Sequence, residues 1–381
     1  MNSIKINGKK IITEKLLINL FLKGVAVVKP SKILKDYIYI KNKEILITCG
    51  SKKLSYKNIK RILPICVGKG AVETAETVNL IFKKKKYNIE KGVLVVNKEN
   101  FKKVPNFKSF TSGHPLPNKN GIIAAKYIVN YLKNTHQEDL VLIFISGGGS
   151  SLLPYPVKNV SLTDKITVNK YLLESGANID EINTVRKHLS QIKGGNLAKF
   201  CFPARVHSLI LSDVVGDNVS SISSGLTVPD PSTFNDSKNI LLKYNLWKKM
   251  PKTIINHIKT GIEFKELETP KNGNKIFKNS SYTIIGSNTK SLEEIRRNCI
   301  KKDIKCKIWK KNIEGDVREV AKNFVLDLKI KKIKKPMILI SGGETTLQVK
   351  GSGLGGRNQE FALYFINRHI DRPNYSRGYC G

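Results

Sequence analysis

Two apolar runs of the chain end in glycine clusters, and these junctions constrain the fold more than any other feature. Leu140–Ile145 is followed by three glycines and three serines, and Ile338–Ile340 by Ser341, Gly342 and Gly343. A short apolar run bounded by glycine is typical of a buried strand in a parallel sheet. Backbone N–H groups that follow such strands bind anions in α/β proteins. The sequence therefore predicts α/β units that hold an anionic ligand.

Size and composition describe a folded protein with room for two domains. The chain has 381 residues, of which 40% are hydrophobic and 25% are charged, as in ordinary globular proteins. No apolar run approaches the roughly 20 residues of a membrane span, and no apolar block of signal-peptide length follows the N-terminus. We therefore expect a cytoplasmic protein that contacts no membrane. The six cysteines form no CxxC pair, which predicts reduced thiols.

The formal net charge of +37 has two interpretations. A basic field of this size could bind nucleic acid. However, 57 of the 67 basic residues are lysines spread along the whole chain, and runs such as Lys83–Lys86 and Lys331–Lys335 adjoin apolar segments without interleaved aromatic residues. We therefore favour solvated surfaces and expect no nucleic-acid partner.

Apolar segments of strand and helix length alternate along the chain, which predicts an α/β fold. A polar stretch with proline and glycine, Thr269–Asn274, interrupts this pattern. We place a domain boundary there and expect one α/β domain at 1–270 and a second at 271–381. Strands are expected at 62–67, 92–97, 140–145, 206–211, 282–285 and 305–309, and helices at 71–83, 122–132, 166–174, 179–192, 291–299 and 317–328.

Lys69 lies in a Gly-Lys-Gly turn between a predicted strand and a predicted helix. This turn places it at the carboxyl end of a strand, where open α/β sheets bind ligands and where helix N-termini attract anions. The Walker pattern GxxxxGKS/T is not matched. A functional lysine and an ordinary surface turn are equal alternatives from these residues alone.

The loop after the strand at 140–145 offers several hydrogen-bond donors to a phosphate or a carboxylate. It consists of Ser146, Gly147, Gly148, Gly149 and Ser150. A flexible turn is the alternative, but a simple turn does not need a glycine triplet at the end of so apolar a strand. We therefore predict that these residues bind the anionic group of a ligand.

Two further positions are candidates with an ordinary alternative. The predicted helix at 179–192 carries Asn183, Arg186 and Lys187 at spacings of three and four, which puts them toward one face. Arg186 is thus a candidate for the cationic wall of a ligand cleft, and a solvated helix face is an equal alternative. His114, in a loop with glycine and proline, is either a catalytic base or, more commonly in such loops, a turn residue.

Asp213 and Asp217 follow the predicted strand at 206–211. Mg²⁺ usually takes one or two protein carboxylates together with substrate phosphates, so both are candidate magnesium ligands. Either one could instead cap the next helix. We favour a functional role for at least one of them.

Six stretches, taken together and in order, carry a resemblance to a known family. They are VGKGA (67–71), SGHPLPN (112–118), ISGGGSSLLPYP (145–156), INTVRKHLSQIKGGNLA (182–198), LSDVVGDNVSSISSGLTVPDPSTF (211–234) and ISGGETTLQVKGSGLGGRNQE (340–360). The chain resembles the glycerate 2-kinases of the MOFRL type, some of which carry the older label hydroxypyruvate reductase. The resemblance spans roughly residues 16–366, and six stretches in the family's order are specific where each alone is weak.

This resemblance implies a fold and an activity. The expected fold is a two-domain α/β protein, with a Rossmann-like, mostly parallel sheet in the larger N-terminal domain and a second, MOFRL-type α/β domain. The active site is expected in the cleft between the domains. The implied reaction is the phosphorylation of D-glycerate at its 2-hydroxyl by ATP with Mg²⁺, which gives 2-phosphoglycerate and ADP.

The resemblance also implies roles for residues of both domains. Lys69 and Arg357 match the lysine and arginine regarded as essential in the family. Arg357 would bind the transferring phosphoryl group or the glycerate carboxylate, since bidentate contacts suit arginine, and Asn358 and Glu360 are expected to contact the substrate beside it. The candidates for holding Mg²⁺ or accepting the hydroxyl proton are Asp213, Asp217 and Glu344, with Asp213 also expected among the catalytic residues.

The chain departs from the family after Ile366, where its last residues do not resemble the family's continuation. Missing strands would leave sheet edges unpaired. We therefore expect a truncated, incomplete MOFRL-type domain.

Three rival functions remain open from the sequence. Residues 351–356 satisfy the GxGxxG pattern of an NAD(P)H-dependent hydroxypyruvate reductase, but no βαβ unit follows them. The others are an inactive truncated homologue and, explained by charge alone, a nucleic-acid-binding protein. A homodimer is compatible with the sequence.

Overall fold

The computed structural model describes residues 3–6, 9–83, 87, 89–330, 337–348 and 354–369. The chain forms two compact units, one made of Val28–Ser287 and the other of Met1–Val27 together with Asn288–Gly381. This division differs from the expected boundary near residue 270. The strand β11 (Ser280–Gly286) belongs to the larger unit because it pairs with a strand of the larger sheet.

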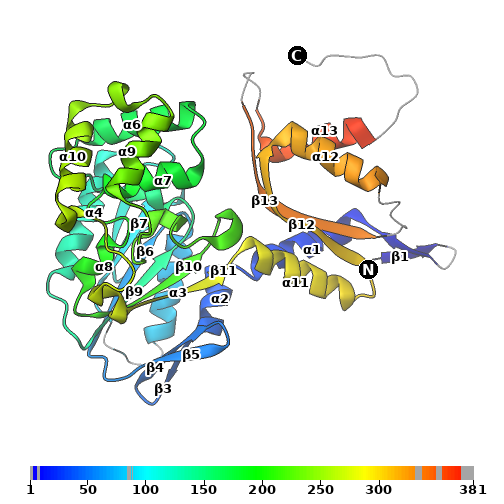
Figure 1. Ribbon diagram of the computed structural model, residues 1–381. Helices are drawn as coiled ribbons and strands as arrows, with labels where there is room; N and C mark the ends of the chain where they lie inside the picture. Colours follow the sequence, from blue (N-terminus) through cyan, green and yellow to red (C-terminus); the bar gives the residue numbers. More distant parts are fainter. Residues whose placement is uncertain are drawn as a thin grey trace. The chain divides into compact units, whose positions relative to one another are not determined.

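The larger unit is built on six parallel strands in the order β11-β10-β9-β6-β7-β8 (Figure 1). Besides β11, they are β6 (Arg61–Val67), β7 (Gly92–Asn97), β8 (Phe107–Ser112), β9 (Asp139–Ile145) and β10 (Arg205–Leu211). The chain lays down β6, β7 and β8 toward one edge and then returns to place β9 on the other side of β6. This is the Rossmann strand order, and its direction reverses between β6 and β9. Ligands of such sheets bind beyond the carboxyl ends of the strands at this point.

Helices and short 3₁₀ turns complete the larger unit. They are α2 (Pro30–Tyr37), α3 (Ala71–Lys83), α4 (Lys119–Leu132), α5 (Gly149–Leu152), α6 (Leu162–Glu174), α7 (Ile179–His188), α8 (Asn196–Cys201), α9 (Phe234–Lys243) and α10 (Lys252–Glu263), with short 3₁₀ turns η1 (Lys98–Asn100), η2 (Val215–Asp217), η3 (Ile222–Ser224), η4 (Trp247–Lys249), η5 (Lys265–Leu267) and η6 (Lys275–Asn279). In Figure 1 the helices α6, α7, α9 and α10 gather at one end of this unit. They share a core of their own, which includes Leu172, Val185 and Leu241.

Both faces of the large sheet are covered. On β6, Leu63, Ile65 and Val67 join the core on the α4 side, whereas Ile62 and Cys66 join the core on the α3 side. A small antiparallel sheet of β3 (Ile38–Lys41), β4 (Glu44–Cys49) and β5 (Lys52–Tyr56) lies on the α3 side as well. This two-sided burial explains why the central strands are continuous apolar runs in the sequence.

The smaller unit combines helices with a two-stranded parallel sheet. Its elements are β1 (Ser3–Ile6), β2 (Lys9–Ile12), α1 (Glu14–Ala26), α11 (Asn288–Ile300), β12 (Cys306–Asp316), α12 (Val317–Ile330), β13 (Ile338–Thr346) and α13 (Arg357–His369). The helices α1 and α11 pack through Leu16, Leu20 and Ile295, and Ile338 joins that core. The expectation that β13 is a buried strand is wrong: of its nine residues only Ile338 and Thr345 are buried, since β12 and β13 form a sheet of just two strands.

Most predicted elements are confirmed, and one strand of the large sheet was missed. The helix at 71–83 and the strand at 92–97 have the predicted bounds. The missed strand, β8, has the sequence FKSFTS, in which polar residues interrupt any apolar run.

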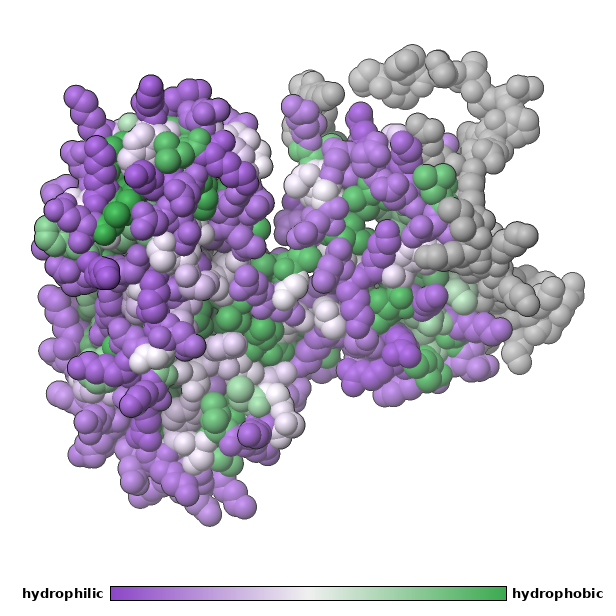
Figure 2. Space-filling model, viewed as in Figure 1, coloured by the Kyte–Doolittle hydropathy of each residue, from purple (hydrophilic) through white to green (hydrophobic). Residues whose placement is uncertain are grey.

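Hydrophilic residues dominate the surface in view. Figure 2 shows them over most of the visible face of both units, with smaller hydrophobic patches between them. No helix in the described part of the chain is long and apolar enough to cross a membrane.

Candidate active site at the carboxyl edge of the larger sheet

The loops after β6 and β9 are joined to each other where the strand order reverses. Ser146 N donates to Val67 O at 2.9 Å, and Lys69 N donates to Gly147 O at 2.9 Å. The Ser146 hydroxyl accepts a hydrogen bond from Gly70 N at 3.0 Å. The structure thus brings the predicted Lys69 turn and the predicted glycine loop together at the place where a parallel sheet binds its ligand.

Three polar side chains converge on Gly147 and Gly148. A Cβ atom on Gly147 would collide with the carboxylate Oδ2 of Asp213. A Cβ atom on Gly148, which has φ of +87°, would lie 2.8 Å from His114 Cδ2 and 3.5 Å from Lys69 Cε. The absence of side chains at these two glycines is therefore what allows Lys69, His114 and Asp213 to surround the loop.

The charges around this loop act on His114. Burial lowers the pKa of His114 below its ordinary value, the nearby charge of Lys69 acts in the same direction, and Asp213 opposes both. His114 is therefore a neutral imidazole at neutral pH. Asp213 itself is exposed, and Asp217 is half-buried with φ of +56°.

A cavity of about 300 Å³ extends from the glycine loop toward the helices α6 and α7. At one end it is lined by His114, Gly148 and Asp213. Further lining residues that carry polar groups are Ser150, Lys165, Asn169, Asn183, Arg186, Lys193, Ser221 and Ser223. Arg186 therefore lies at a cavity.

Sequence reasoning missed Lys165 and Lys193. Lys193 is 2% exposed, and its Nζ donates to Ser150 O at 2.7 Å and to Ser150 Oγ at 2.9 Å. Lys165 donates to Leu189 O at 3.0 Å. One signal could have indicated Lys193: it directly precedes Gly194 and Gly195, which both have positive φ. Lys165 resembles any other helix lysine of the chain.

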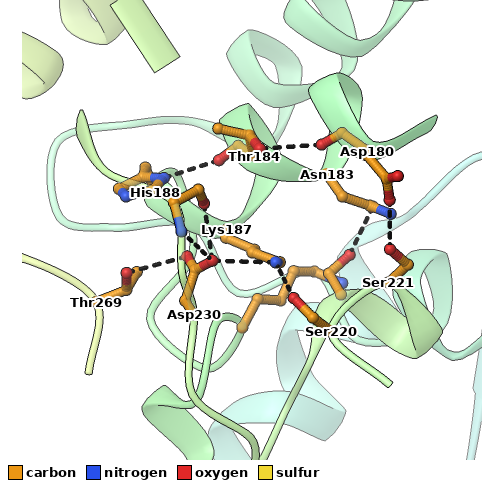
Figure 3. Close-up of polar contacts among 12 residues, drawn as sticks. Asp180, Asn183, Thr184, Lys187, His188, Ser220, Ser221, Asp230 and Thr269 are labelled. Atoms are coloured by element: carbon orange, nitrogen blue, oxygen red, sulfur yellow. Dashed lines mark hydrogen bonds and ion pairs between the residues drawn. The ribbon is translucent and has the colours of Figure 1, made fainter. Parts of the chain in front are cut away.

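A second network holds α7 in place (Figure 3). Lys187 was expected to share a face with Arg186, but it points to the buried Asp230 instead, with Nζ 3.1 Å from Oδ1. Burial alone would raise the pKa of Asp230, yet Lys187 and the hydrogen bonds to Asp230 lower it overall. Asn183 accepts a hydrogen bond from Ser224 at 3.0 Å. The network ties α7 to the segment 218–230 and so fixes the cavity wall.

The predicted residues of the smaller unit form ion pairs among themselves. Arg357, the first residue of α13, donates through Nη2 to Glu344 Oε1 at 2.6 Å, and both side chains are about half exposed. Glu360 accepts from Arg318 Nε at 2.6 Å, and Asn358 is exposed. The predicted phosphoryl-binding arginine is thus paired with a predicted metal ligand.

Comparisons with known proteins agree with this architecture. Two family models match: a domain of unknown function, DUF4147, at residues 16–259, and the MOFRL family at residues 337–377. The chain is 36% identical over 344 residues to a glycerate 2-kinase of Pyrococcus horikoshii, which covers 89% of this chain and 74% of that protein. The family is therefore decided. The chain belongs to the glycerate 2-kinase family.

Further members agree in sequence and in structure. A D-glycerate 2-kinase of Thermotoga maritima is 35% identical over 359 residues, or 92% of this chain and 78% of that protein. The crystal structure of a Thermotoga maritima glycerate kinase superimposes with a TM-score of 0.76 at 34% identity and covers 93% of this chain and 79% of that one. The two-domain α/β fold expected from the resemblance is thereby confirmed.

The carboxylates of this glycerate 2-kinase family member are compatible with Mg²⁺. Within the described ranges, no three His, Cys, Asp or Glu side chains gather in a metal-binding cluster. Mg²⁺ does not require one, because it commonly takes one or two carboxylates and completes its shell with water and substrate phosphates. The carboxylate of Asp213 fills the space beside Gly147, so a hard oxygen ligand lies against the predicted phosphate loop.

Proposed function

We propose that this chain transfers the γ-phosphoryl group of ATP to the 2-hydroxyl of D-glycerate, giving 2-phosphoglycerate and ADP. The observation that carries the proposal is the convergence of Lys69, His114 and Asp213 on Gly147 and Gly148, at the ligand-binding point of a Rossmann-ordered sheet. The names of the relatives supply the substrate. The cytoplasmic location and the homodimer stay predictions from the sequence.

Phosphoryl transfer depends on positioning and on charge stabilisation, and the site supplies both. Backbone N–H groups of Gly147–Ser150 bind phosphate oxygens, together with the hydroxyls of Ser146 and Ser150. The ammonium of Lys69 neutralises charge that develops on the transferring group. Gly147 and Gly148 let that group approach the backbone, because no Cβ stands in its way.

Asp213 is the preferred carboxylate at the reacting centre. It accepts the proton of the 2-hydroxyl or holds Mg²⁺, and Asp217 and Glu344 are the other candidates for the metal. Bound Mg²⁺ neutralises the charge of the phosphates. His114 is neutral, so it contributes a hydrogen bond rather than a charge.

Arg357 is assigned to the phosphoryl group or the glycerate carboxylate. Its guanidinium pairs with the carboxylate of Glu344, and this pairing supports its assignment to an oxyanion. A substrate anion would exchange with Glu344. Asn358 and Glu360 keep their proposed place beside the substrate.

One assay separates this function from its nearest rival. Purified protein is supplied in parallel with D-glycerate, ATP and Mg²⁺, and with hydroxypyruvate and NADH. We expect formation of ADP and 2-phosphoglycerate in the first mixture and no NADH oxidation in the second. NADH oxidation without ADP formation would replace the kinase with a reductase, and silence in both mixtures would favour an inactive homologue.

A further inference from the structure

Three cationic side chains line the cavity together, and one of them contacts Ser150, the last residue of the glycine loop. They are Lys165 on α6, Arg186 on α7 and Lys193 in the segment after α7. The charges of Lys165 and Arg186 act on Lys193, and that of Arg186 acts on Lys165. The cluster thus joins segments far apart in the sequence around one small space.

The partners of these cations are neutral oxygens. Lys165 bonds a backbone carbonyl and Lys193 bonds Ser150. Arg186 donates through Nε to Asn169 Oδ1 at 2.7 Å, and its Nη2 donates to the same oxygen. No ion pair of these three side chains occurs in the described part of the chain. Asp213 lines the cavity as well, and its carboxylate lies beside Gly147.

Such a cluster is unfavourable without an anion. Burial and the neighbouring cation lower the pKa of Lys165 to about 7, burial lowers that of Arg186 to about 10, and burial with both neighbours lowers that of Lys193 well below its ordinary value. Buried charges are normally paired, and a bound anion would relieve both the repulsion and the lost solvation.

Donors remain for such an anion. An ammonium has three N–H donors and a guanidinium has five. Lys165 uses one of its donors, while Lys193 and Arg186 each use two. The remaining N–H groups belong to side chains that line the cavity, and N–H groups of lysine and arginine form strong, charge-assisted hydrogen bonds with carboxylates.

The size of the cavity suits a small anion. At about 300 Å³ it lies at the lower limit of small-molecule pockets. It is continuous from the cations to His114, Gly148 and Asp213. A short molecule bound by the cations therefore lies in the same cavity as His114, Gly148 and Asp213.

We propose that Lys165, Arg186 and Lys193 form the pocket for the carboxylate of the acceptor, and that this pocket selects small hydroxy acids over neutral polyols. The assignment rests on the proposed kinase function for the hydroxyl end of the cavity. It adds Lys165 and Lys193 to the residues that determine specificity, and it gives Arg186 the acceptor carboxylate rather than a nucleotide phosphate.

The test compares Lys165→Met and Arg186→Gln with Lys170→Met as the matched control. Lys170 lies on the same helix but is exposed and pairs with Glu174. Loss of one charge-assisted contact should raise the KM for D-glycerate about 10- to 100-fold, leave the KM for ATP unchanged, and weaken discrimination against glycerol. Lys170→Met should match the unsubstituted protein. Thermal unfolding of each variant checks that it is folded, and Arg186→Lys provides a second, charge-conserving variant.

Direct binding of D-glycerate without nucleotide, measured by titration calorimetry, separates the two proposals. Binding that weakens in Lys165→Met, in a protein that transfers no phosphoryl group, would refute the kinase function and support the pocket. Normal catalysis with unchanged KM for D-glycerate in both variants would refute the pocket alone. A rise in the KM for ATP instead would assign the cations to nucleotide phosphates and overturn the proposal.

Discussion

The carboxylate of Asp213 occupies the space that a Cβ atom of Gly147 would need. The loops after β9 and β10 therefore fit together at this point only because residue 147 is a glycine. The sheet sets this contact, since β9 and β10 are paired neighbours whose chains leave at the same edge. The two loops consequently act as one site, with the carboxylate held against the backbone proposed to bind phosphate.

A first prediction concerns this contact. Gly147→Ala should displace Asp213 and lower kcat by at least about 100-fold, since a small misplacement of catalytic groups has effects of that order. Asp213→Asn, which keeps the shape and removes the charge, should lower kcat without the crowding. Steady-state kinetics with D-glycerate and ATP measure both. A fully active Gly147→Ala protein would show that the contact has no role in the reaction.

A second prediction separates two similar ion pairs of the smaller unit. Arg357→Lys should abolish most turnover, because lysine cannot reproduce a bidentate contact to a phosphoryl or carboxylate group. The Arg357–Glu344 pair is half exposed, so its loss should lower the free energy of unfolding by less than about 1 kcal/mol.

Arg297→Lys is the control for that variant. Arg297 forms a comparable 2.6 Å pair with Glu294, and neither residue has a proposed contact with substrate. Its turnover should stay close to that of the unsubstituted protein. Equal losses in the two variants, or near-normal activity of Arg357→Lys, would refute the role of Arg357.

A third prediction concerns the stability of the cavity wall. Lys187 and Asp230 are almost fully buried, with side-chain exposures of 5% and 0%. Lys187→Met leaves the carboxylate of Asp230 without its cation and should lower the free energy of unfolding by about 3–5 kcal/mol. Denaturant titration measures this change. Adding Asp230→Asn should recover part of the loss, because the unpaired charge is then removed; a double variant no more stable than the single one would contradict this explanation.

The sequence predicted the parts of the site that follow apolar strands. Lys69, the Ser146–Ser150 loop and Asp213 each come directly after such a run. Parallel strands bring their carboxyl ends to one edge, so position in the sequence sufficed to predict position in space. The same apolar runs predicted the central strands, because a strand that is buried on both faces is apolar along its whole length.

The missed features depend on tertiary packing. Lys165 and Lys193 are two of 57 lysines, and only the packing of α6 against α7 gives them a cavity. Lys187 follows Arg186 directly, so no spacing rule could show that it turns to Asp230. The strand β11 was placed in the second domain because local pattern does not reveal which sheet a strand joins.

The last prediction uses the lowered pKa of Lys165, which is about 7 because of burial and the charge of Arg186. The titratable groups around it are Arg186, Lys193 and, on α10, His257, whose pKa burial lowers. Above pH 7 the unliganded Lys165 loses its proton, whereas a bound carboxylate favours the ammonium and raises its pKa. Acceptor binding should therefore take up protons, and affinity for D-glycerate should fall as pH rises above about 7.

Calorimetry in buffers of different ionisation enthalpy measures the proton uptake directly. Lys165→Met should take up fewer protons than the unsubstituted protein, with any remainder due to Lys193, whose pKa is also lowered. Lys170→Met, on the exposed side of α6, should keep the full uptake. An affinity that stays constant from pH 6 to 9, or an uptake that survives Lys165→Met unchanged, would show that the carboxylate binds elsewhere.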